Sequence, residues 1–433
     1  RQPLCGFVTG FADGPGDLDP EQIRDIEAVL GDMAFFDQAL LSVAQRMADY
    51  YRCHLIDVLR CALPEGLTQK VERVVSWSGN EDLDKALAKL EQAAPAQAKV
   101  VQAIRARGGS VTMTELKDLF DSSSRLSGLL SALRESGLVD TETVLEPPRV
   151  QPKKVLTAAL CQPPEVVEDQ LGELRRQAPK QARILELLLA AGRPVVVAEL
   201  VKAAETSHAA IRQLELKELL HTVQVESNRM VAGSGLITGD RKHTLTDQQE
   251  AALATIAAEL SADPPRPILL HGVTASGKTE VYLRVIADVL ERGKQVIVLV
   301  PEISLTVQTI EIFRNRFGDR VAILHSALSP GERFDEWRRV ARGQVDICVG
   351  ARSAIFAPFR NLGMVVIDEE HEPSYKQEST PRYHARQVAL WRAERSGAAV
   401  LLGSATPSVE SYWHARQGRY ALVEMTERVG GRP

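Results

Sequence analysis

The sequence predicts an α/β protein whose carboxyl-terminal part is a parallel sheet covered by helices on both faces. From about residue 245 onward, short apolar runs alternate with helical stretches, as expected of strands that are buried on both faces. The runs are residues 268–270, 296–300, 321–324, 345–349, 364–367 and 399–402. The first run leads into a glycine-rich turn and then a helix, which is the setting of a phosphate-binding loop.

The glycine-rich turn has the spacing G-x-x-x-x-G-K-T. Its members are Gly272, Val273, Thr274, Ala275, Ser276, Gly277, Lys278 and Thr279. Glycines let backbone N–H groups curl around a triphosphate, and the following helix adds the positive end of its dipole. Lys278 is expected to reach the outer phosphates and the Thr279 hydroxyl to ligate Mg²⁺. We therefore expect ATP and Mg²⁺ as cofactors and assign the next residue, Glu280, to the same site. Ala275 stands where glycine is expected, which nucleotide binding should survive unless φ there is positive.

Two acids follow the strand at residues 364–367. Carboxylates at the carboxyl end of a parallel strand lie beside phosphates that are bound at that edge. Asp368 is expected to hold Mg²⁺ through its water shell, and Glu369 to orient and deprotonate the attacking water. The sequence therefore predicts that both acids face Lys278.

A third motif, Gly403-Ser404-Ala405-Thr406-Pro407, follows the strand at residues 399–402. Its small hydroxyl residues suit a hinge that senses the nucleotide. The pattern alone would be an ordinary turn, but as the third motif in order it indicates a nucleotide-driven machine.

An internal repeat precedes the sheet, over residues 97–150 and 181–235. Gly108 corresponds to Gly192 and Val111 to Val195, both at an offset of 84 positions. Each copy has the element order of a winged helix, with recognition helices expected at residues 123–135 and 207–220. These helices carry few Lys and Arg residues, so a DNA reader and a protein-docking or spacer module both remain open. A Pro-rich linker is expected at residues 151–180 between the two copies.

Composition and net charge limit which classes of protein fit the sequence. A chain of 433 residues is expected to form several domains. The net charge of −5 gives no overall basic character, although local basic patches remain compatible with it. No apolar run is long enough to span a membrane, so we expect no membrane partner. The five cysteines form no C-x-x-C pair, so we expect no zinc site here and a cytoplasmic, reducing location.

The order of these motifs resembles the superfamily 2 helicases, and within them the family of PriA-type replication-restart DNA helicases. The resemblance is carried by residues 272–282, 300–306, 324–326, 349–356, 368–371, 374–377, 382–386 and 403–407. It implies a RecA-like helicase lobe over residues 245–430. It also implies that residues 1–93 are the end of an amino-terminal DNA-binding domain of the kind that binds strand 3′ ends.

The resemblance also assigns roles to single residues. Gln249 would read the adenine, and His371 would couple hydrolysis to motion. Contacts with single-stranded DNA, or coupling to it, would come from Pro301, Ser304, Arg352, Ser353, Ser404 and Thr406. An aromatic-rich loop would link DNA contact to hydrolysis through Tyr375, Lys376, Arg382, Tyr383, His384 and Arg386. The residue types fit that role, because aromatic faces stack on bases and flanking cations meet phosphates.

The activity that the resemblance implies is ATP-dependent 3′-to-5′ unwinding of stalled or abandoned replication forks, followed by reloading of the replicative helicase. The implied partners are forked and single-stranded DNA, primosome and helicase-loading proteins, and the single-stranded DNA-binding protein. The family's second lobe and its zinc module have no counterpart here, so we expect a piece cut at both ends that hydrolyses little ATP. Two rivals are another superfamily 2 DNA translocase and a fork-binding scaffold with an inactive motor.

Overall fold

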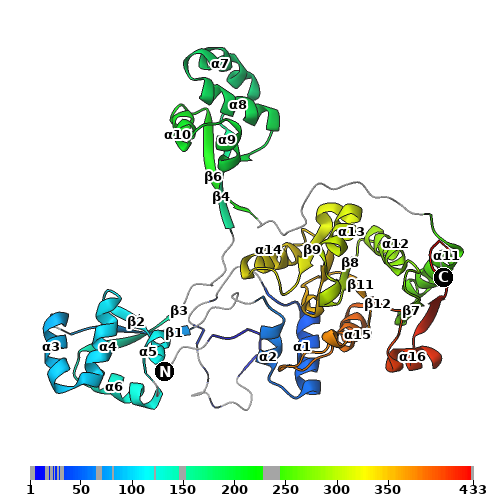
Figure 1. The fold of residues 1–433 in the computed structure, drawn as a ribbon, viewed down its shortest axis with the longest axis horizontal. Helices are drawn as coiled ribbons and strands as arrows, with labels where there is room; N and C mark the ends of the chain where they lie inside the picture. Colours follow the sequence, from blue (N-terminus) through cyan, green and yellow to red (C-terminus); the bar gives the residue numbers. More distant parts are fainter. Residues whose placement is uncertain are drawn as a thin grey trace. The chain divides into compact units, whose positions relative to one another are not determined.

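The structure is a computed structural model. It describes residues 5–14, 19, 23, 25–26, 29, 34–64, 71–79, 82–120, 123–145, 153–227 and 244–430. The chain divides into two compact units, Arg1–Ala34 with Leu63–Val150, and Phe35–Ala62 with Gln151–Pro433. Figure 1 traces the elements of both units along the chain. Among the residues described, no helix is long and apolar enough to cross a membrane.

The first unit contains the first copy of the repeat. Its elements are β1 (Val71–Trp77), α3 (Leu83–Ala93), α4 (Pro95–Ala106), β2 (Ser110–Thr112), α5 (Met113–Asp118), α6 (Ser123–Glu135) and β3 (Val139–Leu145). The strands form an antiparallel sheet in the order β2-β1-β3. Helices α4 and α6 bury their apolar faces with Val75 and Val139 of the sheet in one core. This domain therefore has a core of its own.

The second unit contains the second copy with the same element order. Its elements are β4 (Lys153–Leu160), α7 (Pro164–Gln177), α8 (Pro179–Ala191), β5 (Val195–Val196), α9 (Val197–Ala203), α10 (His208–Leu216) and β6 (Leu220–Ser227). The sheet order β5-β4-β6 repeats that of the first copy. The repeat is therefore real, and each copy carries the helix, strand, helix, helix and strand of the expected winged-helix order.

Both expected boundaries around the repeat are wrong, because each copy starts one strand and one helix earlier. The expected linker at residues 151–180 contains β4 and α7, and the expected first domain, residues 1–93, contains β1 and α3. The prolines misled the prediction. Pro163 is the N-cap of α7 and Pro164 is its first residue, where a missing N–H costs nothing.

The expected parallel sheet is present and has seven strands in the order β13-β7-β12-β11-β8-β10-β9. The strands are β7 (Ile268–Gly272), β8 (Gln295–Leu299), β9 (Val321–Leu324), β10 (Ile347–Gly350), β11 (Leu362–Ile367), β12 (Ala399–Ser404) and β13 (Ala421–Met425). Every pairing in it is parallel. All six predicted strands occur, and β13 is the one that the prediction did not name.

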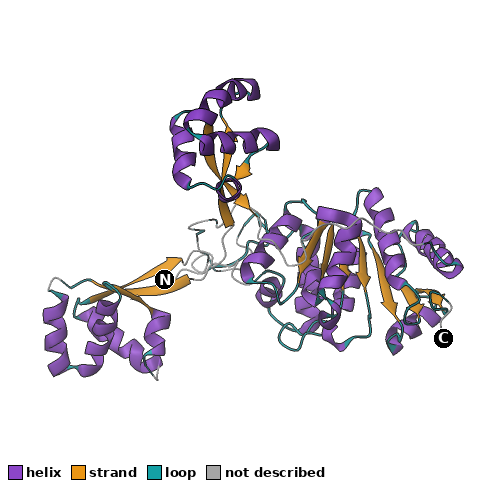
Figure 2. Cartoon of the chain, turned by 45° about the horizontal axis from the view of Figure 1, so that its top comes forward, coloured by secondary structure: helices purple, strands orange, loops and turns teal. Residues whose placement is uncertain are grey.

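Helices cover both faces of this sheet (Figure 2). They are α11 (Asp247–Leu260), α12 (Lys278–Glu291), α13 (Val307–Phe317), α14 (Pro330–Ala341), α15 (Ala385–Ser396) and α16 (Val409–Arg416). Helices α11 to α13 share one apolar core with alternate residues of the strands. The remaining strand residues point to the opposite face, where α15 packs on β11 and β12.

Two helices from the beginning of the second unit also pack on this lobe. Helix α1 (Gln38–Tyr51) and helix α2 (Leu55–Cys61) form a pair, and α1 lies against α15. Asp37 caps α1 by accepting a hydrogen bond from the Leu40 N–H. The helix ends at Arg52, whose φ of 53° turns the chain toward α2.

Candidate nucleotide site and DNA-coupling loop

The phosphate-binding loop leaves β7 and enters α12 as predicted. Gly277 is the N-cap of α12 with a φ of 83°, and a Cβ there would lie 2.2 Å from Gln249 Nε2. The position therefore requires glycine. The Lys278 ammonium donates a hydrogen bond to the Gly272 carbonyl over 2.8 Å. Ser276 Oγ is buried and has no hydrogen-bond partner in the part of the chain that the structure describes. A lysine on a backbone carbonyl and an orphaned hydroxyl, at a helix N-terminus, fit a phosphate group.

Ala275 has a φ of 64°. This is the condition under which nucleotide binding was expected to suffer, because a Cβ in the left-handed region costs roughly 1–2 kcal/mol. The Val429 N–H donates to the Ala275 carbonyl over 3.0 Å. A backbone contact from beyond β13 therefore holds the turn in this conformation.

Asp368 lies at the end of β11 and faces the phosphate-binding helix. Its Oδ1 accepts a hydrogen bond from the Tyr282 hydroxyl over 2.9 Å. Burial raises the pKa of Asp368, while the Tyr282 hydrogen bond and the charge of Lys278 oppose the rise and the charge of Glu369 adds to it. Asp368 and Lys278 are therefore close enough to interact, at one edge of the sheet.

Glu369 follows in the left-handed region, with a φ of 44°. Its Oε2 lies 3.7 Å from His371 Nδ1. A non-glycine residue in this region costs about 1–3 kcal/mol and persists where the surrounding structure fixes it. Such backbone strain is concentrated at functional sites. The sequence assigned Glu369 to a site of this kind.

His371 joins the acidic motif to the third motif. Its Nδ1 lies 2.8 Å from Ser404 Oγ, and its Nε2 lies 3.4 Å from Thr406 Oγ1. Ser404 is fully buried at the end of β12, whereas Thr406 is exposed. The contact gives His371 the connection that a coupling role requires.

Tyr282 is a site residue whose role the motif pattern did not reveal. Its hydroxyl occupies the space above Gly403, where an added Cβ would lie 1.6 Å from that oxygen. Gly403 therefore provides room for the tyrosine that orients Asp368. An aromatic residue one turn inside the phosphate-binding helix was the available clue.

Glu370 was also missed, although it stands within the acidic motif. Its side chain is buried and forms an ion pair with Arg386 over 2.5 Å. The carboxylate also accepts from the N–H and Oγ of Ser408 and from Ser411 Oγ. This network joins the acidic motif to the first turns of α15 and α16.

Two expected nucleotide contacts are otherwise engaged. The Glu280 carboxylate pairs with Arg284 at 2.7 Å and with Arg316 at 2.9 Å, and its contact with nucleotide stays a prediction. Gln249 accepts from the Thr246 N–H and donates to the Ser276 carbonyl over 3.2 Å. Gln249 thus supports the phosphate-binding loop, and its contact with adenine stays a prediction.

The aromatic-rich loop differs from expectation in three residues. The Tyr375 and Tyr383 rings are each 1% exposed, so neither face is open for stacking on a base. Tyr375 donates to the Asp368 carbonyl over 2.7 Å, and Tyr383 packs edge-on against Phe356. Arg386 is committed to Glu370 rather than to a phosphate. Burial around the acidic motif explains why these three side chains are engaged within the protein, and their coupling roles stay predictions.

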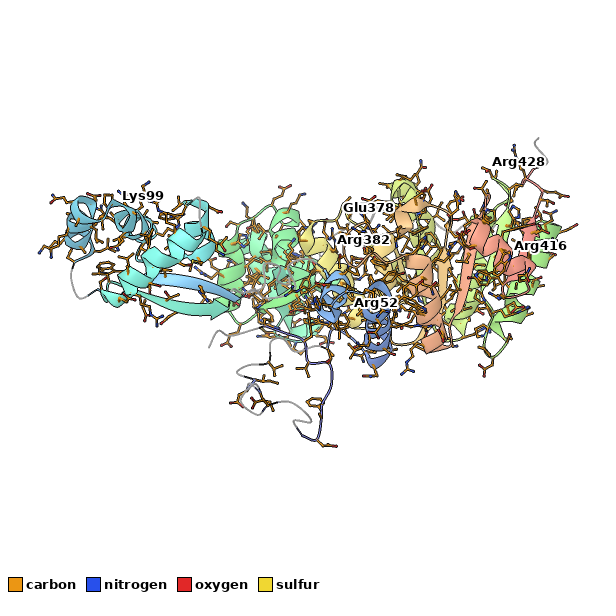
Figure 3. The ribbon with its side chains drawn as sticks, turned by 90° about the horizontal axis from the view of Figure 1, so that it is seen from below. Arg52, Lys99, Glu378, Arg382, Arg416 and Arg428 are labelled. Atoms are coloured by element: carbon orange, nitrogen blue, oxygen red, sulfur yellow. The ribbon has the colours of Figure 1, made fainter. Side chains whose placement is uncertain are left out.

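The loop keeps two exposed cations, Lys376 and Arg382, and Arg382 is labelled in Figure 3. Lys376 donates to the Arg382 carbonyl over 2.6 Å. The His384 side chain is half-buried and caps α15 by accepting from the Arg386 N–H. Burial and the neighbouring charges of Arg386 and Lys376 lower the pKa of His384 to about 4.

The remaining expected DNA contacts lie on two short turns. Ser304 and Ser353 are exposed, whereas Pro301 is buried. Arg352 donates from one terminal nitrogen to the carbonyls of Ser374 and Lys376, over 2.9 Å and 2.5 Å. Arg352 therefore supports the aromatic-rich loop, and DNA contact by these four residues stays a prediction.

Comparisons with known proteins agree with this geometry. Residues 246–412 match the DEAD/DEAH box helicase family, and residues 1–64 match a 3′ DNA-binding domain described for PriA. The fold and the site thus define a helicase-type P-loop protein.

Relatives narrow the class further. The replication restart protein PriA of Bacillus subtilis (strain 168) is 39% identical over 99% of this chain and 51% of its own length. The protein of the same name from Treponema pallidum (strain Nichols) is 48% identical over 44% of this chain and 28% of its own length. A solved structure of RecG bound to a three-way DNA junction is 28% identical over 45% of this chain and 25% of its own, with a TM-score of 0.34. Over nearly all of its length the chain is similar to replication restart proteins named PriA, and it spans about half the length of the first two curated relatives that it matches.

Proposed function

We propose that this chain carries the ATP-driven motor lobe of a DNA helicase that moves 3′ to 5′ and acts on stalled or abandoned replication forks. Its partners in this role are forked and single-stranded DNA, the single-stranded DNA-binding protein, and the primosome proteins that reload the replicative helicase. The observation that supports the motor role is the convergence of Lys278, Tyr282 and Asp368 at one sheet edge. The polarity and the fork substrate are supported by the similarity to replication restart proteins.

The residues divide the hydrolysis of ATP among them. Lys278 leaves the Gly272 carbonyl to meet the outer phosphates, and the buried Ser276 hydroxyl gains a partner at the same time. Thr279 and Asp368 would hold Mg²⁺, which supplies charge neutralisation on the phosphate oxygens. Glu369 accepts the proton of the water whose oxygen attacks the terminal phosphorus, and ADP leaves with the electron pair of the broken P–O bond.

Two sets of contacts then transmit the change at the ATP site to the third motif and to the aromatic-rich loop. His371 passes it to Ser404 and Thr406, and Tyr375 connects the backbone of Asp368 to the aromatic-rich loop. In this proposal the exposed Lys376 and Arg382 of that loop meet DNA phosphates. Lys376, which is proposed to contact DNA, therefore directly follows Tyr375, which hydrogen-bonds to the acidic motif.

The test is ATP hydrolysis by the complete gene product with and without forked DNA. Lys278→Ala should reduce DNA-stimulated turnover by about 10³-fold or more, because the positive charge that faces the transferred phosphoryl group is lost. Lys99→Ala, an exposed lysine on α4, is the matched control and should hydrolyse ATP at the parent rate (Figure 3). A Lys278→Ala protein that retained every activity would instead indicate a fork-binding scaffold.

Unwinding assays separate the remaining rival. Forks with and without a leading-strand 3′ end at the junction should be processed differently by a restart helicase. Equal unwinding of both forks, with no reloading of the replicative helicase, would favour a different DNA translocase of the same superfamily.

A further inference from the structure

A second set of contacts, from helix α1, holds the aromatic-rich loop. The Tyr51 hydroxyl, at the end of α1, accepts a hydrogen bond from the His384 N–H over 3.1 Å. The Lys376 ammonium lies 5.4 Å from the centre of the Tyr51 ring, within reach of a cation–π contact. Lys376 and His384 also pair with each other as an isolated β-bridge. One tyrosine therefore contacts both ends of the loop.

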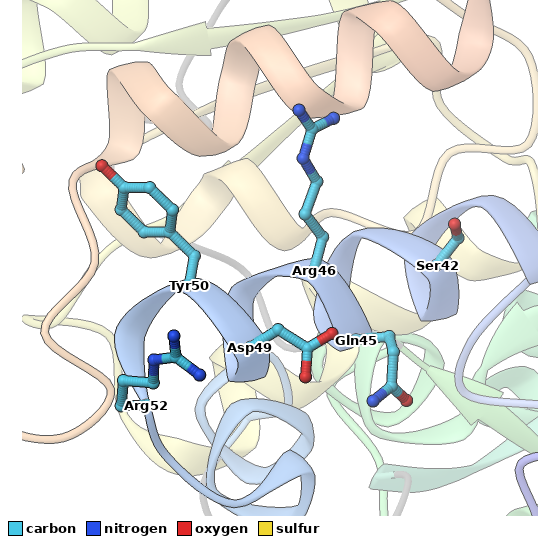
Figure 4. A pocket seen from close by; sticks show the side chains of 6 residues that line it. All are labelled: Ser42, Gln45, Arg46, Asp49, Tyr50 and Arg52. Atoms are coloured by element: carbon cyan, nitrogen blue, oxygen red, sulfur yellow. The ribbon is translucent and has the colours of Figure 1, made fainter.

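The rest of α1 is fixed in place on α15. Arg46 pairs with Glu394 over 2.6 Å and its guanidinium lies 5.0 Å from the centre of the Trp391 ring. The Tyr50 and Tyr51 rings lie 5.2 Å and 6.1 Å from the same indole. Figure 4 shows this face of α1, with Arg46 and Tyr50 reaching toward the neighbouring helix. Tyr51 thus acts from a support that is itself anchored.

A further contact comes from α2. The Cys61 and Tyr383 side chains are close enough to affect each other's pKa, and the Arg352 guanidinium lies 5.9 Å from the centre of the Tyr383 ring. The helix pair α1–α2 therefore contacts the loop at three residues, Lys376, Tyr383 and His384.

The loop continues without a break to the acidic motif. Arg352 binds the carbonyls of Ser374 and Lys376, and Tyr375 between them donates to the Asp368 carbonyl. A displacement of Lys376 or His384 would therefore act on Tyr375 and through it on Asp368. None of these contacts uses the nucleotide itself.

We propose that Tyr51 is a positioning residue that holds residues 376–384 in the conformation that passes DNA contact to the ATP site. Helix α1 lies within residues 1–64, the part that matches a 3′ DNA-binding domain. Tyr51 thereby joins that domain directly to the motor. The inference depends on the proposed function, because it assumes that DNA stimulates hydrolysis.

The test compares Tyr51→Phe with Tyr50→Phe in the complete gene product. Both substitutions remove one hydroxyl and keep the ring, but only the first removes the acceptor of the His384 N–H. With Tyr51→Phe, the DNA concentration that gives half-maximal stimulation of ATP hydrolysis should rise about three- to tenfold, the effect of one lost hydrogen bond. The DNA-free rate and the KM for ATP should stay at parent values, and Tyr50→Phe should match the parent throughout.

Amide hydrogen exchange provides a second readout. The His384 amide should exchange faster in Tyr51→Phe than in Tyr50→Phe, because its acceptor is gone. Unchanged exchange would overturn the inference. So would a Tyr51→Phe protein whose DNA-free rate and melting temperature fall together, since that would indicate a structural role alone.

The Lys278→Ala variant distinguishes failure of this inference from failure of the proposed function. If Lys278→Ala abolishes stimulated hydrolysis while Tyr51→Phe follows the parent DNA curve, the motor stands and Tyr51 has no positioning role. If Lys278→Ala retains stimulated hydrolysis, the proposed function fails, and the inference fails with it.

Discussion

Tyr282 shows how much of the site depends on one residue to which the motifs gave no role. It joins α12 to Asp368 and fills the space that Gly403 leaves open. Without it, the buried carboxylate would lose the hydrogen bond that favours its charged form. The residue therefore controls the ionisation of the acid that is assigned to Mg²⁺.

Tyr282→Phe should lower ATP hydrolysis by about tenfold, because a hydrogen bond to a charged group is lost. Loss of this hydrogen bond raises the pKa of Asp368 further, so the carboxyl group ionises only at a higher pH. The acidic limb of the pH–rate profile should accordingly move to higher pH. Tyr412→Phe, on the exposed face of α16, is the control, and a profile identical to the parent in both variants would contradict the assignment.

Gly277 and Ala275 both have positive φ, but we expect different effects when each is substituted. Gly277→Ala places a Cβ 2.2 Å from Gln249 Nε2, so binding of an ATP analogue should be lost. Ala275→Gly removes a strained side chain, and its unfolding free energy should stay within about 1 kcal/mol of the parent, since the flexibility of glycine offsets the relief. Fluorescent-nucleotide titration and urea unfolding measure both effects. Intact binding by Gly277→Ala would be inconsistent with the described turn.

At the scale of elements, the loop between β11 and α15 is where sequence and structure differ most. The motifs predicted the strands, the phosphate-binding loop and the placement of Asp368 beside Lys278. They also led us to expect exposed aromatic rings, whereas Tyr375 and Tyr383 are buried. The residue type indicates that an aromatic ring packs against another group, but it does not identify that group. Only the fold decides that Phe356 rather than a base lies against Tyr383.

Arg386→Ala should destabilise the lobe by about 3–5 kcal/mol, because it leaves the buried Glu370 carboxylate without its cation. Glu370→Gln with Arg386→Ala should cost less than the sum of the single changes, as contacting residues do. Urea unfolding of the single and double variants gives the coupling. Additive effects would show that the two side chains do not form a pair.

His384 predicts a pH dependence for the first turn of α15. Its pKa is lowered to about 4 in the folded chain, against 6.5 for an ordinary histidine. Between these values the unfolded chain binds more protons, so stability should fall as the pH drops from about 6.5 toward 4. Melting temperatures of the parent and His384→Asn across that window provide the measurement. An equal decline in both would assign the effect to another group.

At the scale of the whole molecule, the described residues form three separate cores with two kinds of element order. Two copies of a strand-helix-helix-strand-helix-helix-strand domain have their own cores, and the seven-stranded sheet has a third. The sequence repeat predicted that two similar domains exist, but prolines at helix starts concealed where each begins. Periodicity alone cannot mark a boundary when a proline occupies the one helix position that tolerates it.

The central claim is that residues 272–279 grip a triphosphate while Asp368 faces it from β11. Crystals grown with a non-hydrolysable ATP analogue and Mn²⁺ test this directly, because manganese gives an anomalous peak. The account predicts one peak between Thr279 and Asp368, with the Lys278 ammonium moved from the Gly272 carbonyl to the terminal phosphate. A nucleotide bound elsewhere, or a peak remote from both Thr279 and Asp368, would contradict it.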